Sequence, residues 1–73
     1  MHYVYVIERW KENGWQYYIG YSSDLEDRLE RHKTEYRCRL KYYEAFGNET
    51  AARETEQKLK HYGSAWRALK ERM

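Results

Sequence analysis

The 73-residue chain has no proline, only four glycines and a single cysteine. Without proline or a glycine-rich stretch, no segment has the composition of an interdomain linker, and we expect one domain over residues 1–73. Cys38 has no internal disulfide partner, which favours a reducing compartment and predicts a cytoplasmic location. No apolar run reaches transmembrane length and no cleavable signal pattern is present, so we expect no membrane association.

A large excess of charge of one sign is also lacking. The net charge of +2 gives no global argument for a nucleic-acid partner. What the chain does have is aromatic surface, with nine tyrosines and three tryptophans. Large aromatic side chains compensate for the small core of so short a chain. We therefore expect Trp10, Trp15 and Trp66 to be packing residues rather than stacking platforms.

The clearest local signal is Asn13-Gly14, which lies between two β-rich runs at residues 3–9 and 15–21. Asn-Gly is the preferred sequence of a type I′ turn, because both central residues need positive φ. A two-residue turn there predicts an antiparallel hairpin with Tyr5 and Tyr18 on one face, offset diagonally. Gly20 would leave that face open, so that the two hydroxyls flank a small group such as a phosphate.

A helix is predicted over residues 23–33, because Ser23 and Glu26 have the spacing of a capping box. His32 follows the apolar stripe of this helix, and Arg28 lies one turn earlier at the edge of the stripe. Taken alone, Arg28 is explained equally well as a solvated cation, and His32 as a packed residue at the helix end.

A second helix is predicted over residues 49–62, with Asn48 as its N-cap and Gly63 as its stop. Its inward stripe consists of Ala52, Thr55, Glu56, Leu59 and Tyr62. Glu56 is thus a carboxylate on the apolar side, and it needs a partner because an unpaired buried charge is costly. A metal ion and an ion pair with Arg28 satisfy that need equally well.

The remaining segments complete the predicted architecture. A third strand is expected over residues 40–45, and a last short helix begins after Ser64, anchored by Trp66 and Leu69. The element order is ββαβαα, a three-stranded antiparallel sheet with flanking helices, which is an α+β fold.

Four segments, in this order, resemble the GIY-YIG endonuclease superfamily. They are Tyr3-Val4-Tyr5, Tyr18-Ile19-Gly20, residues 24–32 and residues 52–60. The chain looks especially like the short stand-alone members, which are similar to the N-terminal nuclease domain of excinuclease, the endonuclease of nucleotide-excision DNA repair. The resemblance covers nearly the whole chain, and its first motif reads Tyr-Val-Tyr in place of Gly-Ile-Tyr.

The resemblance implies a divalent-metal-dependent endonuclease that hydrolyses DNA phosphodiester bonds. It assigns the catalytic site to Tyr5, Tyr18, Arg28, His32 and Glu56. Glu56 would hold Mg²⁺ (or Mn²⁺), and Arg28 would neutralise charge on the phosphoryl oxygens. Tyr5 would be the general base, assisted by His32, and Tyr18 would orient the water or the phosphate.

Basic residues at the end of the first predicted helix and just after it cluster with Tyr36, Tyr42 and Tyr43. The predicted nucleic-acid contacts are Arg31, Lys33, Arg37, Arg39 and Lys41. Basic residues interleaved with aromatic ones suit a phosphate backbone and exposed bases, although a solvated face explains them as well. The segment is short for the family, so we expect weak binding to DNA, with a protein partner or a homo-oligomer presenting the substrate.

Two other functions are compatible with the sequence. One is a non-catalytic nucleic-acid-binding module on the same fold, and the other is a small protein-interaction domain with a structural salt-bridge network. Retention of all five site residues argues against the degenerate binding module, whereas the interaction domain would show an exposed apolar patch, which the sequence does not reveal. Glu56 argues most directly against the binding module, because a carboxylate repels phosphate unless a metal lies between them.

Overall fold

The computed structural model describes residues 1–73 and confirms the predicted α+β fold with element order ββαβαα. The elements are β1 (His2–Lys11), β2 (Gly14–Ser22), α1 (Leu25–Glu35), β3 (Cys38–Phe46), α2 (Glu49–His61) and α3 (Gly63–Arg72). The sheet is antiparallel, in the order β2-β1-β3. None of the helices is both long enough and apolar enough to cross a membrane.

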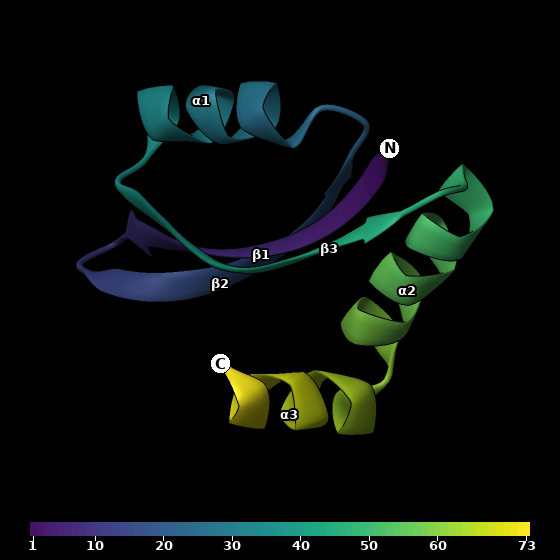
Figure 1. Cartoon of the computed structure of the whole chain (residues 1–73). Helices are drawn as coiled ribbons and strands as arrows, with labels where there is room; N and C mark the ends of the chain where they lie inside the picture. The colour runs from purple at the N-terminus through teal and green to yellow at the C-terminus, as the bar shows by residue number, and fades with distance from the viewer.

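The core is built around the central strand, because helices cover both faces of the sheet. Figure 1 shows α1 on one side of the strands and α3 on the other, with α2 beside them. Val4, Tyr5, Val6 and Ile7 of β1 are fully buried. Side chains alternate between faces along a strand, so Tyr5 lies on the α1 side, whereas Val4 and Val6 lie on the opposite face.

The hairpin turn lies one residue earlier than predicted. Its two central residues are Glu12 and Asn13, with φ of 55° and 64°, and Lys11 pairs with Gly14. The expected Asn13-Gly14 turn is therefore wrong. Positive φ is unfavourable for a residue with a Cβ, so Glu12 accepts strain that the predicted turn would avoid.

Cross-strand pairing explains this register. Tyr5 lies opposite Gly20, and Trp10 lies opposite Trp15 with the ring centroids 5.3 Å apart, edge to face. An aromatic pair such as Trp10–Trp15 stabilises a sheet by about 0.2–1 kcal/mol, which offsets part of the strain in the turn. Both registers pair odd positions with even ones, so Tyr5 and Tyr18 share a face as predicted.

Gly20 does not leave this face open, which corrects the prediction. A Cβ at Gly20 would lie 2.5 Å from Cζ and Oη of Tyr5, and 2.9 Å from Cε1 of Tyr18. The Tyr5 ring therefore covers the glycine directly. The missing side chain makes room for a catalytic candidate rather than for a ligand.

Helix α1 begins later than predicted, and the expected capping box at Ser23 does not form. Asp24 is the N-cap, and its side chain accepts a hydrogen bond from the Asp27 backbone at 3.1 Å. Ser22 fixes this start, because its hydroxyl accepts from the Asp24 N–H at 3.0 Å and donates to the Asp24 carbonyl at 2.8 Å.

Helix α2 follows the prediction more closely. Asn48 is its N-cap and accepts from the Ala51 N–H at 2.7 Å. Ala52 and Glu56 are buried, but Tyr62 is 63% exposed and is not part of the inward stripe. Tyr62 lies outside the helical register, since it caps the end of α2 and the start of α3. The last helix begins at Gly63 itself, and Leu69 is its buried anchor, with Trp66 half-buried.

Candidate active site

Three aromatic rings from distant parts of the chain meet on the α1 side of the sheet. Oη of Tyr5 lies 2.9 Å from Nε2 of His32. The Tyr18 ring centroid is 6.2 Å from that of Tyr5 and 5.0 Å from that of His32. Strands β1 and β2 supply the tyrosines, and the second half of α1 supplies the histidine. Three of the predicted site residues are thus brought together.

The protonation states of this cluster follow from burial and nearby charge. Burial, and then Tyr18, raise the pKa of Tyr5 from 10.0 to about 12. Burial lowers the pKa of His32, and the charges of Arg9 and Arg28 lower it further. At neutral pH Tyr5 therefore keeps its proton and His32 is uncharged. In the His32 tautomer that carries its proton on Nδ1, the Tyr5 hydroxyl donates its hydrogen bond to Nε2.

Arg28 lies half-buried on α1 and forms no ion pair. The alternative in which it pairs with Glu56 is wrong. Its positive charge reaches the aromatic cluster, because it lowers the pKa of both Tyr5 and His32. A hollow of about 190 Å³ is lined by Arg28, His32 and two further α1 residues, so both groups are open to a ligand.

Glu56 is buried on the inward side of α2, with 8% of its surface exposed. Its partner is Lys60, one turn further along the helix, whose Nζ lies 3.2 Å from Oε2. The negative charge of Glu56 raises the pKa of Tyr5, which places the carboxylate within electrostatic reach of the aromatic cluster. No hydrogen bond or ion pair joins Glu56 to Tyr5, Tyr18, Arg28 or His32, so its link to the cluster is the effect of its charge on Tyr5.

The carboxylate of Glu56 is the group at this site that suits a metal ion. No three His, Cys, Asp or Glu side chains converge on a common point, so the chain has no multidentate cage. Mg²⁺ is often bound by one or two carboxylates, with water and substrate phosphate as the other ligands. Since Lys60 contacts only Oε2, Oε1 of Glu56 remains available. The residues present fit a site in which Glu56 is the only protein ligand.

Two residues near the site, Arg9 and Lys60, were not predicted from the sequence. The Arg9 guanidinium lies 4.3 Å from the Tyr18 ring centroid and 4.5 Å from that of Tyr36. Strand alternation already places Arg9 on the same face as Tyr5, which was the available signal. Lys60 was detectable too, because it lies four residues after Glu56 on the same helix.

The five predicted DNA-contacting residues do not form one surface. Arg31 and Lys33 lie on α1, whereas Arg39 and Lys41 lie on β3 and both pair with Glu8, on the opposite face of the sheet. Four of the five form ion pairs, with N–O distances between 3.0 and 3.9 Å. Arg37 forms none.

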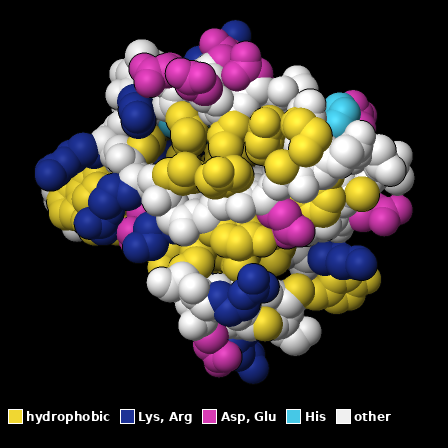
Figure 2. Space-filling view, viewed as in Figure 1, with side chains coloured by type: hydrophobic (Ala, Val, Ile, Leu, Met, Phe, Trp, Pro, Cys, Tyr) yellow, Lys and Arg dark blue, Asp and Glu magenta, His cyan; other side chains and the backbone are white.

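The end of the sheet where the hairpin turns carries a mixed basic and aromatic patch. Figure 2 shows Lys and Arg side chains around a hydrophobic group at this end of the molecule. The Arg39 guanidinium lies 4.0 Å from the Trp15 ring centroid and that of Arg37 lies 5.9 Å away. Trp10 is 39% exposed beside them, so it packs against Trp15 with only part of its surface.

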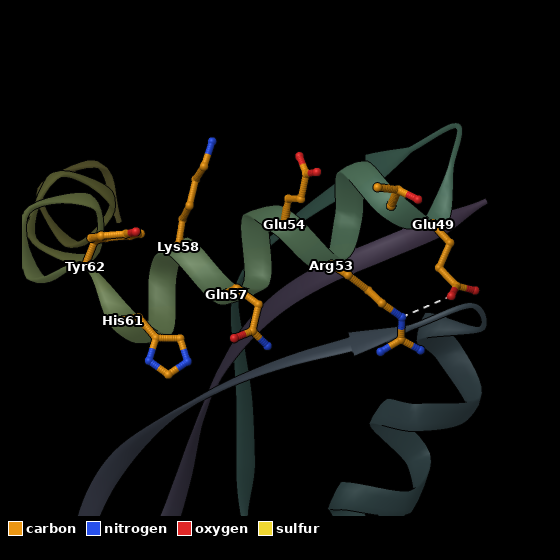
Figure 3. Close-up of a pocket in the computed structure, with 8 residues that line it drawn as sticks. Glu49, Arg53, Glu54, Gln57, Lys58, His61 and Tyr62 are labelled. Carbon is orange, nitrogen blue, oxygen red and sulfur yellow. Dashed lines mark hydrogen bonds and ion pairs between the residues drawn. The ribbon is translucent and has the colours of Figure 1, made fainter.

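The largest hollow on the surface lies elsewhere, along the outer side of α2. It has a volume of about 530 Å³ and contains none of the predicted catalytic residues. Figure 3 shows the ion pair between Glu49 and Arg53 at one end of it, and Glu54 pointing away from the strands. The candidate site is therefore an open surface between elements rather than the deepest hollow.

The comparison with protein families now decides the assignment. The model of the GIY-YIG catalytic domain matches residues 1–68. The chain belongs to the GIY-YIG family. GIY-YIG domains are nucleases, and the matched range includes all five residues of the predicted site. A search of curated proteins and a search of solved structures each give no match.

Proposed function

We propose that this GIY-YIG domain is a divalent-metal-dependent endonuclease that hydrolyses DNA phosphodiester bonds. The observation that carries the proposal is the 2.9 Å contact between Tyr5 and an uncharged His32, beside an arginine without a counter-ion. A general base and a cation for the transition state are the two parts that a chain must supply for phosphodiester hydrolysis.

The Tyr5–His32 pair provides the route for the proton. With a pKa of about 12, Tyr5 is not ionised at neutral pH and does not act as a phenolate in advance. Instead, Tyr5 Oη takes a proton from the attacking water while its own proton passes to Nε2 of His32. A heavy-atom distance of 2.9 Å is within the range needed for such a transfer.

Arg28 stabilises the charge that develops on the phosphoryl oxygens. Its guanidinium is a planar fork of donors that matches two phosphate oxygens, and no carboxylate of the chain competes for it. Tyr18, packed against both Tyr5 and His32, holds the two rings in position and orients the water or the phosphate.

Glu56 would hold the metal ion, most suitably Mg²⁺ or Mn²⁺, through Oε1. The ion would supply Lewis-acid activation and stabilise the leaving oxygen. Lys60 neutralises Glu56 through Oε2 in the absence of the ion, which allows this carboxylate to stay buried.

The Lys60–Glu56 ion pair also favours the second candidate function, a nucleic-acid-binding module without catalysis. A carboxylate that is neutralised by lysine needs no metal and repels phosphate less. The two functions differ in one observable property, because only the nuclease breaks a DNA strand.

Nicking of supercoiled plasmid DNA tests the proposal. We expect conversion to the relaxed circle with Mg²⁺ or Mn²⁺, and none with EDTA. DNA binding without nicking in either metal would refute the nuclease and support the binding module. If the protein neither binds nor nicks DNA, the protein-interaction domain is the candidate function that remains.

A further inference from the structure

Arg9 is unusual among the basic residues of this chain. Of the lysines and arginines that form no ion pair, only Arg9 and Arg28 are half-buried, and the others are exposed. A half-buried cation normally has a counter-ion, because partial desolvation of a charge is costly. Two such cations beside one aromatic cluster indicate that an anion from outside the chain completes the site.

The Arg9 side chain packs against two aromatic rings. Its guanidinium carbon lies between the Tyr18 and Tyr36 rings, 4.3 and 4.5 Å from their centroids. Its Nε is sealed from solvent and has no acceptor, which costs about 1–3 kcal/mol. Cation–π contact with two rings offsets part of that cost. An arginine fixed in this way loses little conformational entropy when it binds a ligand.

The terminal nitrogens of Arg9 remain available to a ligand. Nε is the only Arg9 nitrogen that is both sealed and without a partner, and no carboxylate pairs with this guanidinium. The donor fork of a guanidinium matches two oxygens of a phosphate or of a carboxylate. The charge of Arg9 also extends over the site, since it lowers the pKa of both Tyr5 and His32.

We propose that Arg9 is a second phosphate-binding arginine, which contacts a backbone phosphate of the substrate strand a few nucleotides from the phosphate held by Arg28. Arg9 lies four residues from Tyr5 on the same face of β1, about 13 Å at the rise of a strand. A nucleic-acid strand rises about 3.4 Å per nucleotide, so both positions are spanned by a few nucleotides. Arg9 therefore fits a flanking phosphate, not the one that is cleaved.

This inference rests on the proposed function only in that the ligand is a nucleic acid, so its test avoids cleavage. A fluorescent pentathymidylate is titrated in EDTA against the wild type and the variants Arg9→Gln and Arg9→Lys. Arg67→Gln is the matched control, because Arg67 is unpaired but exposed on α3. We expect Arg9→Gln to lower the slope of log K against log salt by about 0.7, and to weaken binding about fivefold at 0.1 M salt.

Lysine at position 9 should restore the slope but not the full affinity, because it keeps the charge and loses the fork. Equal slopes and affinities for Arg9→Gln and Arg67→Gln would overturn the inference. So would failure of the wild type to bind the oligonucleotide at all.

A second measurement does not depend on the folding of any variant. The sealed Nε–H of Arg9 gives its own nitrogen–proton NMR signal, which should shift as pentathymidylate is added to the wild type. A shift of the Arg28 signal with none at Arg9 overturns the inference and leaves the nuclease standing. Arg9-dependent binding by a protein that never nicks DNA refutes the nuclease and leaves Arg9 as a phosphate ligand.

Discussion

Arg28 is the residue whose role the structure narrows most. The sequence allowed either a transition-state cation or an ion pair with Glu56, and Glu56 pairs with Lys60 instead. We therefore expect Arg28→Lys to reduce the nicking rate by roughly 100-fold, because a point charge lacks the donor fork. Its melting temperature should change little. Near-wild-type turnover of Arg28→Lys would show that charge alone is sufficient at this position.

His32 makes a prediction about stability and pH. Its pKa lies below the ordinary 6.5 in the folded protein, so the unfolded chain takes up the proton first as pH falls. The stability present above pH 6.5 is then lost as pH drops toward the lower folded-state value. Urea unfolding at pH 7.5 and 5.5 measures this loss. The midpoint of the wild type should fall further than that of His32→Gln, and equal shifts would contradict the account.

At the scale of one element, β2 depends on the absence of a side chain at Gly20. A methyl group there would overlap Cζ and Oη of Tyr5, so Gly20→Ala must displace the ring from His32. Such overpacking costs about 1–3 kcal/mol, and we expect the nicking rate to fall by more than the loss of folded protein explains. Gly14→Ala is the control, because nothing lies within 4 Å of a Cβ at that position. Similar activities for the two variants would show that the Tyr5–His32 contact is dispensable.

The helices and the hairpin show which local sequence signals are sufficient to predict where an element begins and ends. Asn48 caps α2 as its sequence predicts, because the cap contact is made within four residues. The Ser23 box fails, because Ser22 binds the backbone of Asp24 and moves the start of α1. The predicted position of the turn is wrong because the pairing of strand residues, and not the turn preference of Asn-Gly, decides the register. Element type is thus predictable from pattern, whereas exact ends depend on neighbouring side chains.

The sequence predicts the site residues that strand faces and family motifs place, and it misses a residue that only tertiary contacts place. Shared strand faces and family motifs bring Tyr5, Tyr18 and His32 together, as the structure shows. Arg9 was missed because its partners, Tyr18 and Tyr36, come from β2 and the end of α1 and meet only after folding. Strand alternation indicates the face that Arg9 shares with Tyr18, but no sequence spacing encodes its contact with Tyr36.

At the scale of the whole molecule, four of the five predicted DNA-contacting cations are held in ion pairs, and only Arg37 is free of one. Arg39 pairs with Glu8 at 3.0 Å, so its contact with a phosphate must break this pair, whereas Arg37 has no such cost. We expect weak binding with little base specificity, and a larger loss of affinity for Arg37→Ala than for Arg39→Ala. Together they should lower the salt slope by less than about 1.8, the value for two duplex phosphate contacts. Fluorescence anisotropy at several salt concentrations measures both quantities, and tight binding to one short duplex that survives both changes would refute this expectation.

The most direct measurement of the central claim compares two carboxylates of α2 in the plasmid nicking assay with Mg²⁺. Glu56 is buried on the inward side of α2. Glu54 is exposed on the outer side of the same helix (Figure 3). We expect Glu56→Gln to abolish nicking while DNA affinity in EDTA is nearly unchanged, and we expect Glu54→Gln to nick like the wild type. Nicking by Glu56→Gln at the wild-type rate would contradict the assignment of this site.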